Sequence, residues 1–120
     1  MQEPRKQLGH EEGRARSLIL DMPQTETISL VSEAFKQLGD PSRLKIFWLL
    51  CHTEKCVSDI ALLVRMSSPA VSHHLRLLKS AGLLEVRRIG KGVYYRASDT
   101  ALVRKLHATI EEVARLSCPS

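Results

Sequence analysis

The fold of this 120-residue chain is indicated most clearly by residues 56–84, CVSDIALLVRMSSPAVSHHLRLLKSAGLL. The stretch predicts two short helices, one from residue 56 to about residue 64 and one over 68–81, around a tight connection. We expect Ser68 to cap the second helix, because its hydroxyl can accept an unpaired backbone N–H and the proline after it suits the first helical position. Gly82 follows where a C-terminal cap is expected.

The second of these helices has two different faces. Val71, Leu75 and Leu78 recur at i, i+4 and i+7, which places them on one apolar face. The opposite face carries hydrogen-bond donors, two of which are permanent cations: Ser72, His73, Arg76 and Lys79. A short helix, a turn and a second helix with outward donors form a helix-turn-helix, whose second helix lies in the DNA major groove. The alternative is an ordinary surface helix whose polar face is only solvated.

After Gly82 the hydrophobic period changes from that of a helix to that of a strand. Residues 84–88, LEVRR, alternate, and residues 93–96, VYYR, are rich in strand formers. Between them, the glycines of residues 90–92, GKG, allow the positive φ that a hairpin turn demands. The hairpin carries four cations on or near its exposed edge: Arg87, Arg88, Lys91 and Arg96. A basic hairpin directly after a helix-turn-helix predicts a wing that binds phosphates, which favours DNA binding over the solvated-face alternative.

Composition limits the partners and the compartment. The net charge of +5 and the pI near 9.4 favour a polyanionic partner. Aromatic residues are only 4% of the chain, which argues against single-strand binding by base stacking. Three irregularly spaced cysteines argue against a disulfide framework, and no apolar run approaches the roughly 20 residues of a membrane span. We therefore expect a cytoplasmic protein with no membrane partner.

The flanking segments complete the predicted domain. Residues 1–24 are expected to form a flexible N-terminal arm, and residues 25–117 a winged helix-turn-helix domain for DNA binding and dimerisation. The fold class is mainly α, with about five helices and a two-stranded hairpin. Residues 28–38 have helical spacing, and a second helix opens at Asp40 with the same cap-plus-proline signal. The stripe that this second helix is expected to bury is Leu44, Phe47, Trp48 and Cys51.

The last predicted helix runs from Asp99, its expected cap, to Leu116. Its apolar stripe is spaced by four, four and three residues: Leu102, Leu106, Ile110 and Val113. The other helices and the hairpin already form a small core, so we expect this stripe to pack against an additional apolar surface. A second copy of the same helix is the simplest one, which predicts a homodimer. The alternative is packing within the monomer.

Four short motifs occur in order along the chain: DPSRL at 40–44, CVSD at 56–59, VSHHL at 71–75 and GVYY at 92–95. Together they resemble the ArsR/SmtB family of bacterial winged-helix repressors, over residues 25–117. The resemblance implies a homodimer that binds a near-palindromic double-stranded DNA operator and releases it when an inducer arrives. It also implies that the helix contacts DNA bases and the DNA backbone through Ser67, Ser68, Ser72, His73 and His74. The wing would make its DNA contacts through Arg87, Arg88 and Lys91. Pro69 stands where relatives often have a polar residue.

The resemblance also implies an inducer site. Cys56 and Asp59 lie three residues apart at the start of a helix, so both can point to one side. Thiolate plus carboxylate suits Zn²⁺ or another divalent transition metal as inducer. In metal-sensing relatives the N-terminal arm completes this site, and here the arm offers His10, Glu11 and Glu12. The alternative is a half-buried Cys56 with Asp59 as a helix-start charge. No organic cofactor is expected.

A second inducer site of the family bridges the paired last helices. This chain keeps Asp99 at that position, but Ala101 replaces a histidine. Arg115 stands at a further ligand position, where a guanidinium has no lone pair to offer a metal. His107 and Glu111, at i and i+4, could contribute to some other arrangement, although such a pair is more often an exposed side-chain contact.

Three other functions are alternatives to a metal-released repressor. One is an architectural or protein-binding winged helix without an inducer. Another is a repressor without metal, either thiol- or redox-responsive through Cys51 and Cys118 or regulated without a ligand. The third is an enzyme, for which the sequence has no Gly-rich phosphate loop and no HExxH motif. The neighbours Ser72, His73 and His74 splay apart on a helix rather than align a nucleophile with its base. We therefore expect a regulator and not an enzyme.

Overall fold

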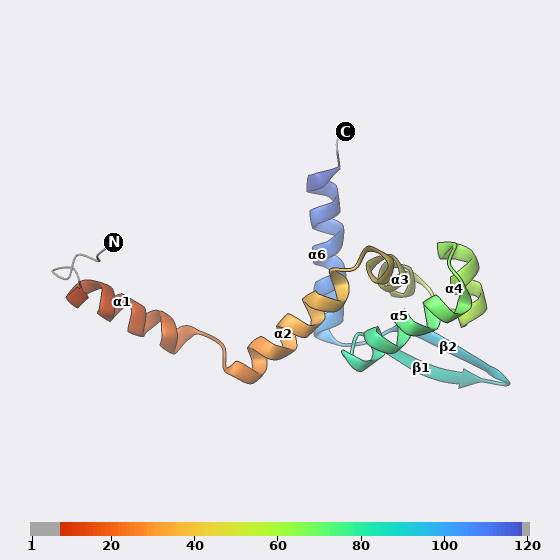
Figure 1. Ribbon diagram of the computed structural model, residues 1–120, viewed down its shortest axis with the longest axis horizontal. Coiled ribbons are helices and arrows are strands. Elements are labelled where there is room, and N and C mark those ends of the chain that lie inside the picture. Colours follow the sequence, from red (N-terminus) through yellow and green to blue (C-terminus); the bar gives the residue numbers. More distant parts are fainter. Residues whose placement is uncertain (1–7, 119–120) are drawn as a thin grey trace. The chain divides into compact units, whose positions relative to one another are not determined.

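The computed structural model describes residues 8–118, and the side chains of residues 11–118. Residues 8–118 form six helices and a two-stranded antiparallel hairpin, and Figure 1 labels these elements. The elements in chain order are α1 Leu8–Asp21, α2 Thr25–Leu38, α3 Pro41–His52, α4 Val57–Val64, α5 Ser68–Ser80, β1 Leu84–Ile89, β2 Gly92–Ala97 and α6 Ala101–Ser117. The predicted fold class is confirmed, with one more helix than expected. Contacts divide the chain into two compact units, Met1–Val31 and Ser32–Ser120.

The unit Met1–Val31 contains the unexpected helix, α1. It forms over LGHEEGRARSLILD because Leu, Glu, Arg and Ala all have high helix propensity, which outweighs the cost of Gly9 and Gly13. The boundary between arm and domain at residues 24 and 25 stays a prediction, as does the flexibility of the arm.

The core of the unit Ser32–Ser120 is almost entirely aliphatic, as the low aromatic content requires. The largest fully buried side chains come from α3, α4, α5 and the residue before β1: Ile46, Phe47, Ile60, Val71, Leu75, Leu78 and Leu83. In this core α3 packs against α5 and β2, and α4 packs against α5. Burying one such side chain stabilises the fold by about 1.5–3 kcal/mol. The helix-turn-helix formed by α4 and α5 is therefore firmly attached along one side.

α3 buries a different stripe from the predicted one. The predicted stripe was Leu44, Phe47, Trp48 and Cys51, of which only Phe47 is fully buried. Ile46 and Leu50 complete the buried face instead, at 0% and 2% exposure. Trp48 is 41% exposed, and its indole N–H donates to Glu111 Oε1 on α6 at 3.0 Å. A polar partner outside the core thus determined where this aromatic side chain lies.

The ends of α5 show why the helix has these bounds. Ser67 is the N-cap, because its Oγ accepts a backbone N–H three residues on at 3.2 Å, and the expected cap at Ser68 was one residue late. Asp40 caps α3 in the same way, accepting the N–H of Arg43 at 3.0 Å, as predicted. Gly82 has φ +77°. The backbone N–H of Gly82 donates to the carbonyl of Lys79, and that of Leu83 donates to the carbonyl of Leu78. This Schellman arrangement confirms Gly82 as the stop.

The hairpin β1–β2, which we call the wing, closes through the two-residue turn Gly90-Lys91. Of the two glycines expected to supply a positive φ, only Gly90 does, at +61°. Gly92 already pairs with β1 as the first residue of β2. A Cβ at Gly92 would lie 2.6 Å from the Tyr94 ring, so a larger residue there would require that ring to shift; the glycine thus serves close packing rather than the turn.

α6 begins after a different cap from the predicted one. Thr100 rather than Asp99 is the N-cap, because its Oγ1 accepts the N–H of Val103 at 3.2 Å. Val103 and Leu106 are the buried residues of α6, at 3% and 7% exposure. Large apolar side chains on the same helix stay exposed: Leu102, Val113 and Leu116. Among residues 8–118, none of the helices has the length and hydropathy needed to span a bilayer.

Candidate nucleic-acid interface and metal cluster

The open face of α5 is the first part of the candidate site. Val71, Leu75 and Leu78 are at most 1% exposed, so the helix is anchored in the core along one side. The opposite side carries exposed polar and cationic side chains: Ser67, Ser68, Ser72, His73, Arg76 and Lys79. His74 lies at the edge of this face and is half-buried. The predicted division of α5 into a buried and an open face is confirmed.

Two arginines fix the imidazoles of this face. Arg76 Nη2 lies 3.0 Å from His73 Nδ1, and Arg43 Nη1 on α3 lies 3.3 Å from His74 Nδ1. A guanidinium can only donate, so each Nδ1 accepts and each neutral ring carries its proton on Nε2. Burial lowers the pKa of His74, which favours this neutral form. Both histidines therefore keep an Nε2–H donor free of the arginine.

Arg43 links α5 to the segment before α3, a contact that the sequence did not reveal. Its Nε donates to the carbonyl of Gln37 on α2 at 2.9 Å. Its backbone N–H is held by Asp40, and this hydrogen bond lowers the pKa of the Asp40 carboxyl. Arg43 and His74 are 31 residues apart, so no local pattern pairs them. The contact fixes one edge of the open face of α5.

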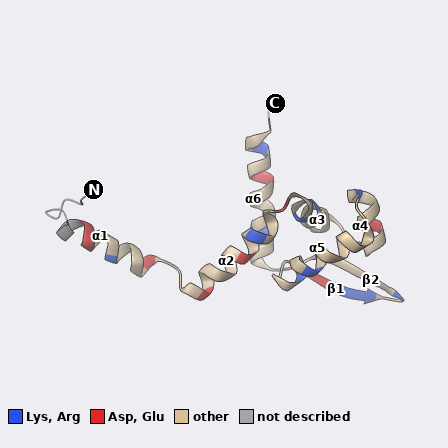
Figure 2. Cartoon of the chain, viewed as in Figure 1, with Lys and Arg blue, Asp and Glu red and all other residues tan. Residues whose placement is uncertain are grey.

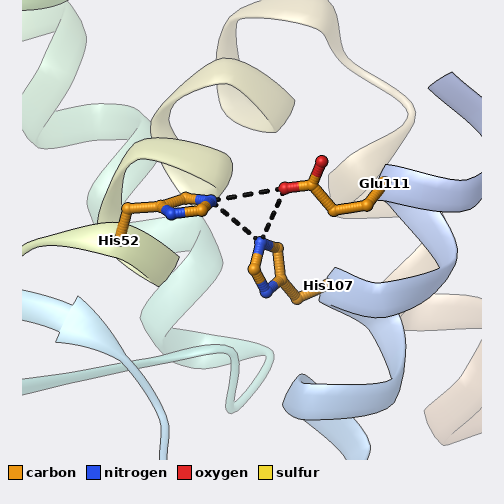
Figure 3. Close-up of side chains that lie close together, drawn as sticks. All are labelled: His52, His107 and Glu111. Atoms are coloured by element: carbon orange, nitrogen blue, oxygen red, sulfur yellow. Dashed lines mark hydrogen bonds and ion pairs between the residues drawn. The ribbon is translucent and has the colours of Figure 1, made fainter. Parts of the chain in front are cut away.

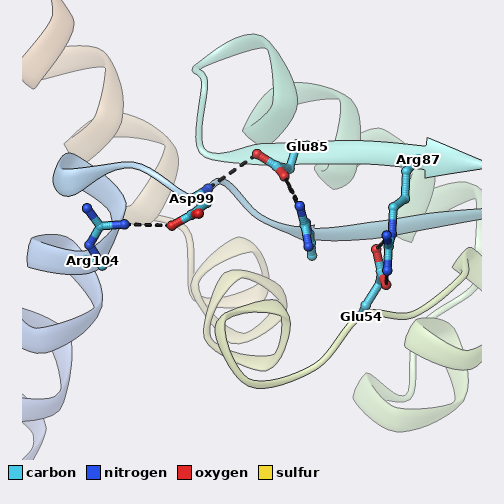
Figure 4. Close-up of polar contacts among 6 residues, drawn as sticks. Glu54, Glu85, Arg87, Asp99 and Arg104 are labelled. Carbon is cyan, nitrogen blue, oxygen red and sulfur yellow. Dashed lines mark hydrogen bonds and ion pairs between the residues drawn. The ribbon is translucent and has the colours of Figure 1, made fainter.

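The wing carries four cations, and two of them are paired within the protomer. Arg87 donates to both carboxylate oxygens of Glu54, at 2.6 and 2.7 Å, and lowers the pKa of that carboxyl (Figure 4). Arg96 pairs with Glu85 at 2.7 Å. Two exposed cations make no ion pair within residues 8–118: Arg88 and Lys91. Figure 2 shows Lys and Arg positions on α5 and along the wing.

The predicted metal ligands are not brought together with a third ligand in the described part of the chain. Cys56 is the half-buried N-cap of α4, with Sγ 3.4 Å from Ser58 Oγ. Asp59 is exposed in the first turn of the same helix. The side chain of His10 lies outside the described residues. A site completed by the N-terminal arm therefore stays a prediction.

A different group of ligand-type atoms converges between the end of α3 and the middle of α6 (Figure 3). His52 Nε2 lies 3.0 Å from His107 Nε2 and 3.4 Å from Glu111 Oε1. His107 Nε2 lies 3.1 Å from the same oxygen. Among the side chains of residues 11–118, this is the one group of three His, Cys, Asp or Glu whose ligand atoms all lie within 4.8 Å. We call these three residues the His-His-Glu cluster.

Sequence reasoning found two of the three residues of this cluster. The i, i+4 spacing drew attention to His107 and Glu111, but His52 is 55 residues from His107 and had no signal of its own. The side chains of His52, His107 and Glu111 are 43%, 27% and 39% exposed, so solvent and ions can reach them.

Neighbouring groups determine the chemistry of the cluster. The indole N–H of Trp48, together with the two imidazoles, hydrogen bonds to Glu111 and lowers the pKa of its carboxyl. Burial, assisted by the charge of Glu111, raises the pKa of the adjacent Cys51 thiol to about 11. That thiol stays protonated at neutral pH, which weakens the thiol-responsive alternative. The atoms offered here are imidazole nitrogens and a carboxylate oxygen.

Ion pairs occupy the positions of the family's interhelical site. Asp99 Oδ1 lies 2.6 Å from Arg104 Nη1, and Glu112 Oε1 lies 2.9 Å from Arg115 Nη2. Each carboxylate is thus matched by a nearby arginine rather than by a histidine.

Two of the hollows that adjoin α6 lie beside features described above. One has a volume of about 380 Å³ and is lined by residues at the end of α3, the end of β2 and the start of α6, including His52 and His107. The other has a volume of about 500 Å³, and its lining, which includes Phe35, Leu38 and Val113, is largely apolar. The first opens beside the His-His-Glu cluster, and the second lies along the exposed apolar side of α6.

The chain is similar in sequence to known proteins. Residues 40–86 match the family described as bacterial regulatory protein, arsR family. The chain is 43% identical over 81 residues to the transcriptional repressor SmtB homolog of Synechocystis sp., a match over 63% of this chain and 61% of that protein. It is 41% identical over 90 residues to the cadmium resistance transcriptional regulatory protein CadC homolog of Staphylococcus aureus, over 72% of this chain and 74% of that protein.

A solved structure agrees with these matches. The homodimeric winged helix-turn-helix DNA-binding domain of a Mycobacterium bovis protein, a possible ArsR-family transcriptional regulator, is 36% identical with a TM-score of 0.68. The similarity covers 75% of this chain and 82% of that domain.

Proposed function

The chain belongs to the arsR family of bacterial regulatory proteins, which are regulators and not enzymes, and we propose that it represses transcription as a homodimer on a near-palindromic DNA operator. A divalent metal ion then acts as the inducer that releases the operator. One observation carries the proposal: α5 is anchored by Val71, Leu75 and Leu78, while its other face is open and lined with donors and cations.

The open face of α5 would enter the major groove. Base contacts fall to Ser72, His73 and Arg76, because these side chains are exposed on the face opposite the core. A guanidinium suits the paired acceptors of guanine, and an Nε2–H donor suits a base acceptor or a phosphate. Contacts to the DNA backbone would come from residues at the edges of this face and at the N-terminus of α5, because a helix N-terminus binds phosphate well. These residues are Ser67, Ser68, His74 and Lys79.

The wing would supply affinity more than sequence choice. Arg88 and Lys91 are exposed and make no ion pair with the described residues 8–118, so both can meet phosphates. Arg87 is held by Glu54, and it would reach DNA only by exchanging that carboxylate for a phosphate. Each phosphate contact made by a cation releases counterions and makes binding depend on salt.

A homodimer would use the exposed apolar side of α6. Leu102, Val113 and Leu116 are 49%, 54% and 79% exposed in the protomer, which is costly for a helix with no partner. The apolar hollow beside them offers a complementary surface, and the Mycobacterium bovis domain is homodimeric. A two-fold pair would present two copies of α5 to successive major grooves, about 34 Å apart.

A metal inducer is supported by the Staphylococcus aureus relative, whose name associates it with cadmium resistance. The expected mechanism is a population shift, in which bound Zn²⁺ or a similar ion favours a dimer whose two α5 helices no longer match successive grooves. A coupling of about 1–3 kcal/mol, or 5–150-fold in affinity, is typical of such a switch. The protein would act in the cytoplasm, where bacterial DNA lies.

Selection of bound duplexes from a randomised library, followed by fluorescence anisotropy, tests this proposal. We expect an enriched sequence with two related half-sites, and a 5–150-fold weaker affinity for it when Zn²⁺ replaces a chelator, as allosteric couplings of about 1–3 kcal/mol give. A library that yields no enriched sequence would contradict the repressor. An enriched sequence whose affinity is unchanged by Zn²⁺, Cd²⁺, Ni²⁺ or Co²⁺ would contradict release by metal.

A further inference from the structure

We propose that His52, His107 and Glu111 bind a divalent metal ion of the Zn²⁺ type within a single protomer, and that the inducer acts there. The second half of this proposal rests on the proposed function. The first half concerns the protein alone, since all three ligands come from one chain and from one compact unit.

The spacing of the three atoms is that of a metal coordination shell. Nitrogen and oxygen ligands lie about 2.0–2.1 Å from Zn²⁺, so the ligands of a tetrahedral ion lie about 3.3 Å from one another. The three separations in the cluster are 3.0, 3.1 and 3.4 Å. Side-chain shifts of a few tenths of an ångström would therefore accommodate the ion, with a fourth position left to solvent or to another ligand.

Hydrogen bonding alone does not explain this triangle. Each Nε2 carries either one proton or one lone pair, and an ionised carboxylate oxygen only accepts. If both imidazoles are protonated on Nε2, the 3.0 Å edge between them brings two N–H groups together. If only one is protonated, an unprotonated nitrogen faces the carboxylate oxygen. A metal ion removes the conflict, because it accepts a lone pair from all three atoms at once.

Supporting contacts hold the ligands in place. His107 and Glu111 are one turn apart on α6 and share a face of that helix. The Trp48 ring packs against His52 with ring centroids 4.2 Å apart and the ring planes tilted by 37°, and its Nε1–H donates to Glu111 Oε1 at 3.0 Å. Trp48 is thus a positioning residue, which explains why an indole ring is kept at the protein surface. Two imidazoles and one carboxylate suit borderline ions such as Zn²⁺, Co²⁺ and Ni²⁺.

One ligand of the cluster, His52, lies on α3, which packs against both α5 and strand β2 of the wing. His52 is the last residue of α3, and Arg43 near the start of α3 contacts His74 on α5. Two residues beyond His52, Glu54 holds Arg87 of the wing (Figure 4). An ion that joins the end of α3 to α6 would therefore favour one arrangement of α3 relative to the dimerising helix. That choice biases the positions of α5 and the wing.

Metal titration of the full chain without DNA tests the site. Co²⁺ serves as the probe, because its visible absorption reports the ligand type, and competition with Zn²⁺ then gives the Zn²⁺ affinity. We expect one Co²⁺ per chain with a spectrum of nitrogen and oxygen ligands. His107→Ala and Glu111→Gln should each weaken binding by at least about 10–100-fold, which is the loss when only an outer-shell partner is removed.

Two further variants make the titration decisive. Glu112→Gln is the matched control, since Glu112 neighbours Glu111 on α6 but points to Arg115, and this variant should bind Co²⁺ as the wild type does. Equal Co²⁺ affinity in the wild type, His107→Ala and Glu111→Gln would overturn the site. A thiolate charge-transfer band that disappears in Cys56→Ser would also overturn it, because the ion would then occupy the other candidate position. Glu111→Gln keeps the size of the side chain, so it decides the matter if His107→Ala does not fold.

The claim that the inducer acts at this cluster is tested by the ratio of the DNA affinity measured without Zn²⁺ to that measured with Zn²⁺. A ratio of about 5–150 in the wild type that falls to near one in Glu111→Gln would support it. A wild-type ratio retained in Glu111→Gln would overturn it while leaving the metal site intact. Should the wild type bind no preferred duplex, the proposed function fails, and the Co²⁺ titration still decides the site.

Discussion

Arg76→Ala removes the strongest candidate base contact without touching the core. The Arg76 side chain is exposed, and its guanidinium contacts His73 at 3.0 Å on the same helix. A surface change of this kind alters the free energy of unfolding by no more than about 0.5 kcal/mol. Removing a base-reading side chain costs about 1–3 kcal/mol in each half-site. In a homodimer the cost doubles to about 2–6 kcal/mol, or roughly 30-fold to more than 10⁴-fold in affinity.

The assay compares two duplexes, the selected operator and a shuffled sequence of equal length and composition, by fluorescence anisotropy. Arg76→Ala should weaken binding to the operator far more than to the shuffled duplex, because base contacts carry the sequence choice. Lys91→Ala is the matched contrast in the wing. It should weaken both duplexes alike, and it should reduce the slope of log K against log salt by about 0.9 for each phosphate that Lys91 neutralises.

Equal weakening on both duplexes would refute the role of Arg76, since it would reduce that residue to a phosphate contact. Unchanged discrimination between the two duplexes would refute the placement of α5 in the major groove. Circular dichroism of the variant must match that of the wild type for either result to count.

Three further predictions concern stability. Leu75 is 1% exposed beneath the open face of α5, so Leu75→Ala should lower the free energy of unfolding by about 2–5 kcal/mol in urea titrations, and a decrease below about 1 kcal/mol would contradict its place in the core. Gly82→Ala forces a side chain into φ +77° and should cost about 1–2 kcal/mol by thermal unfolding, whereas no change would show that the helix stop tolerates alanine. Arg87 holds the pKa of Glu54 below its ordinary value of 4.5, so the stability from this pair is complete above pH 4.5 and is lost as the pH falls through the lowered value. Glu54→Gln should therefore flatten the acid side of the stability profile in urea unfolding measured across that pH, and an unchanged profile would show that the pair contributes nothing.

Features that depend on short stretches of sequence were predictable. The stripe of Val71, Leu75 and Leu78 identified the buried side of α5, because a helix repeats every 3.6 residues whatever surrounds it. Asp40 and Gly82 identified helix ends for the same local reason. The N-caps of α5 and α6 were each predicted one residue away from the observed cap. Two capping-type residues stand side by side at each position, and a shift of one residue changes little in the sequence pattern.

Features that depend on packing between distant elements were not predictable. Trp48 was expected in the core by spacing alone, but its indole N–H found Glu111 on a helix more than sixty residues away. His52 could join His107 only after α3 and α6 had packed, so its sequence context carried no trace of a metal site. The N-terminal capping cysteine Cys56 attracted the metal prediction instead, because its local motif is conspicuous.

Photocross-linking of the operator shows directly whether the open face of α5 lies in the major groove. With 5-iodouracil in place of thymine, the reactive atom projects into the major groove, where the thymine methyl group lies. We expect mass spectrometry to find the cross-links within residues 67–79, on the open face of α5. Cross-links confined to α2 or α6, with none in α5, would contradict this placement.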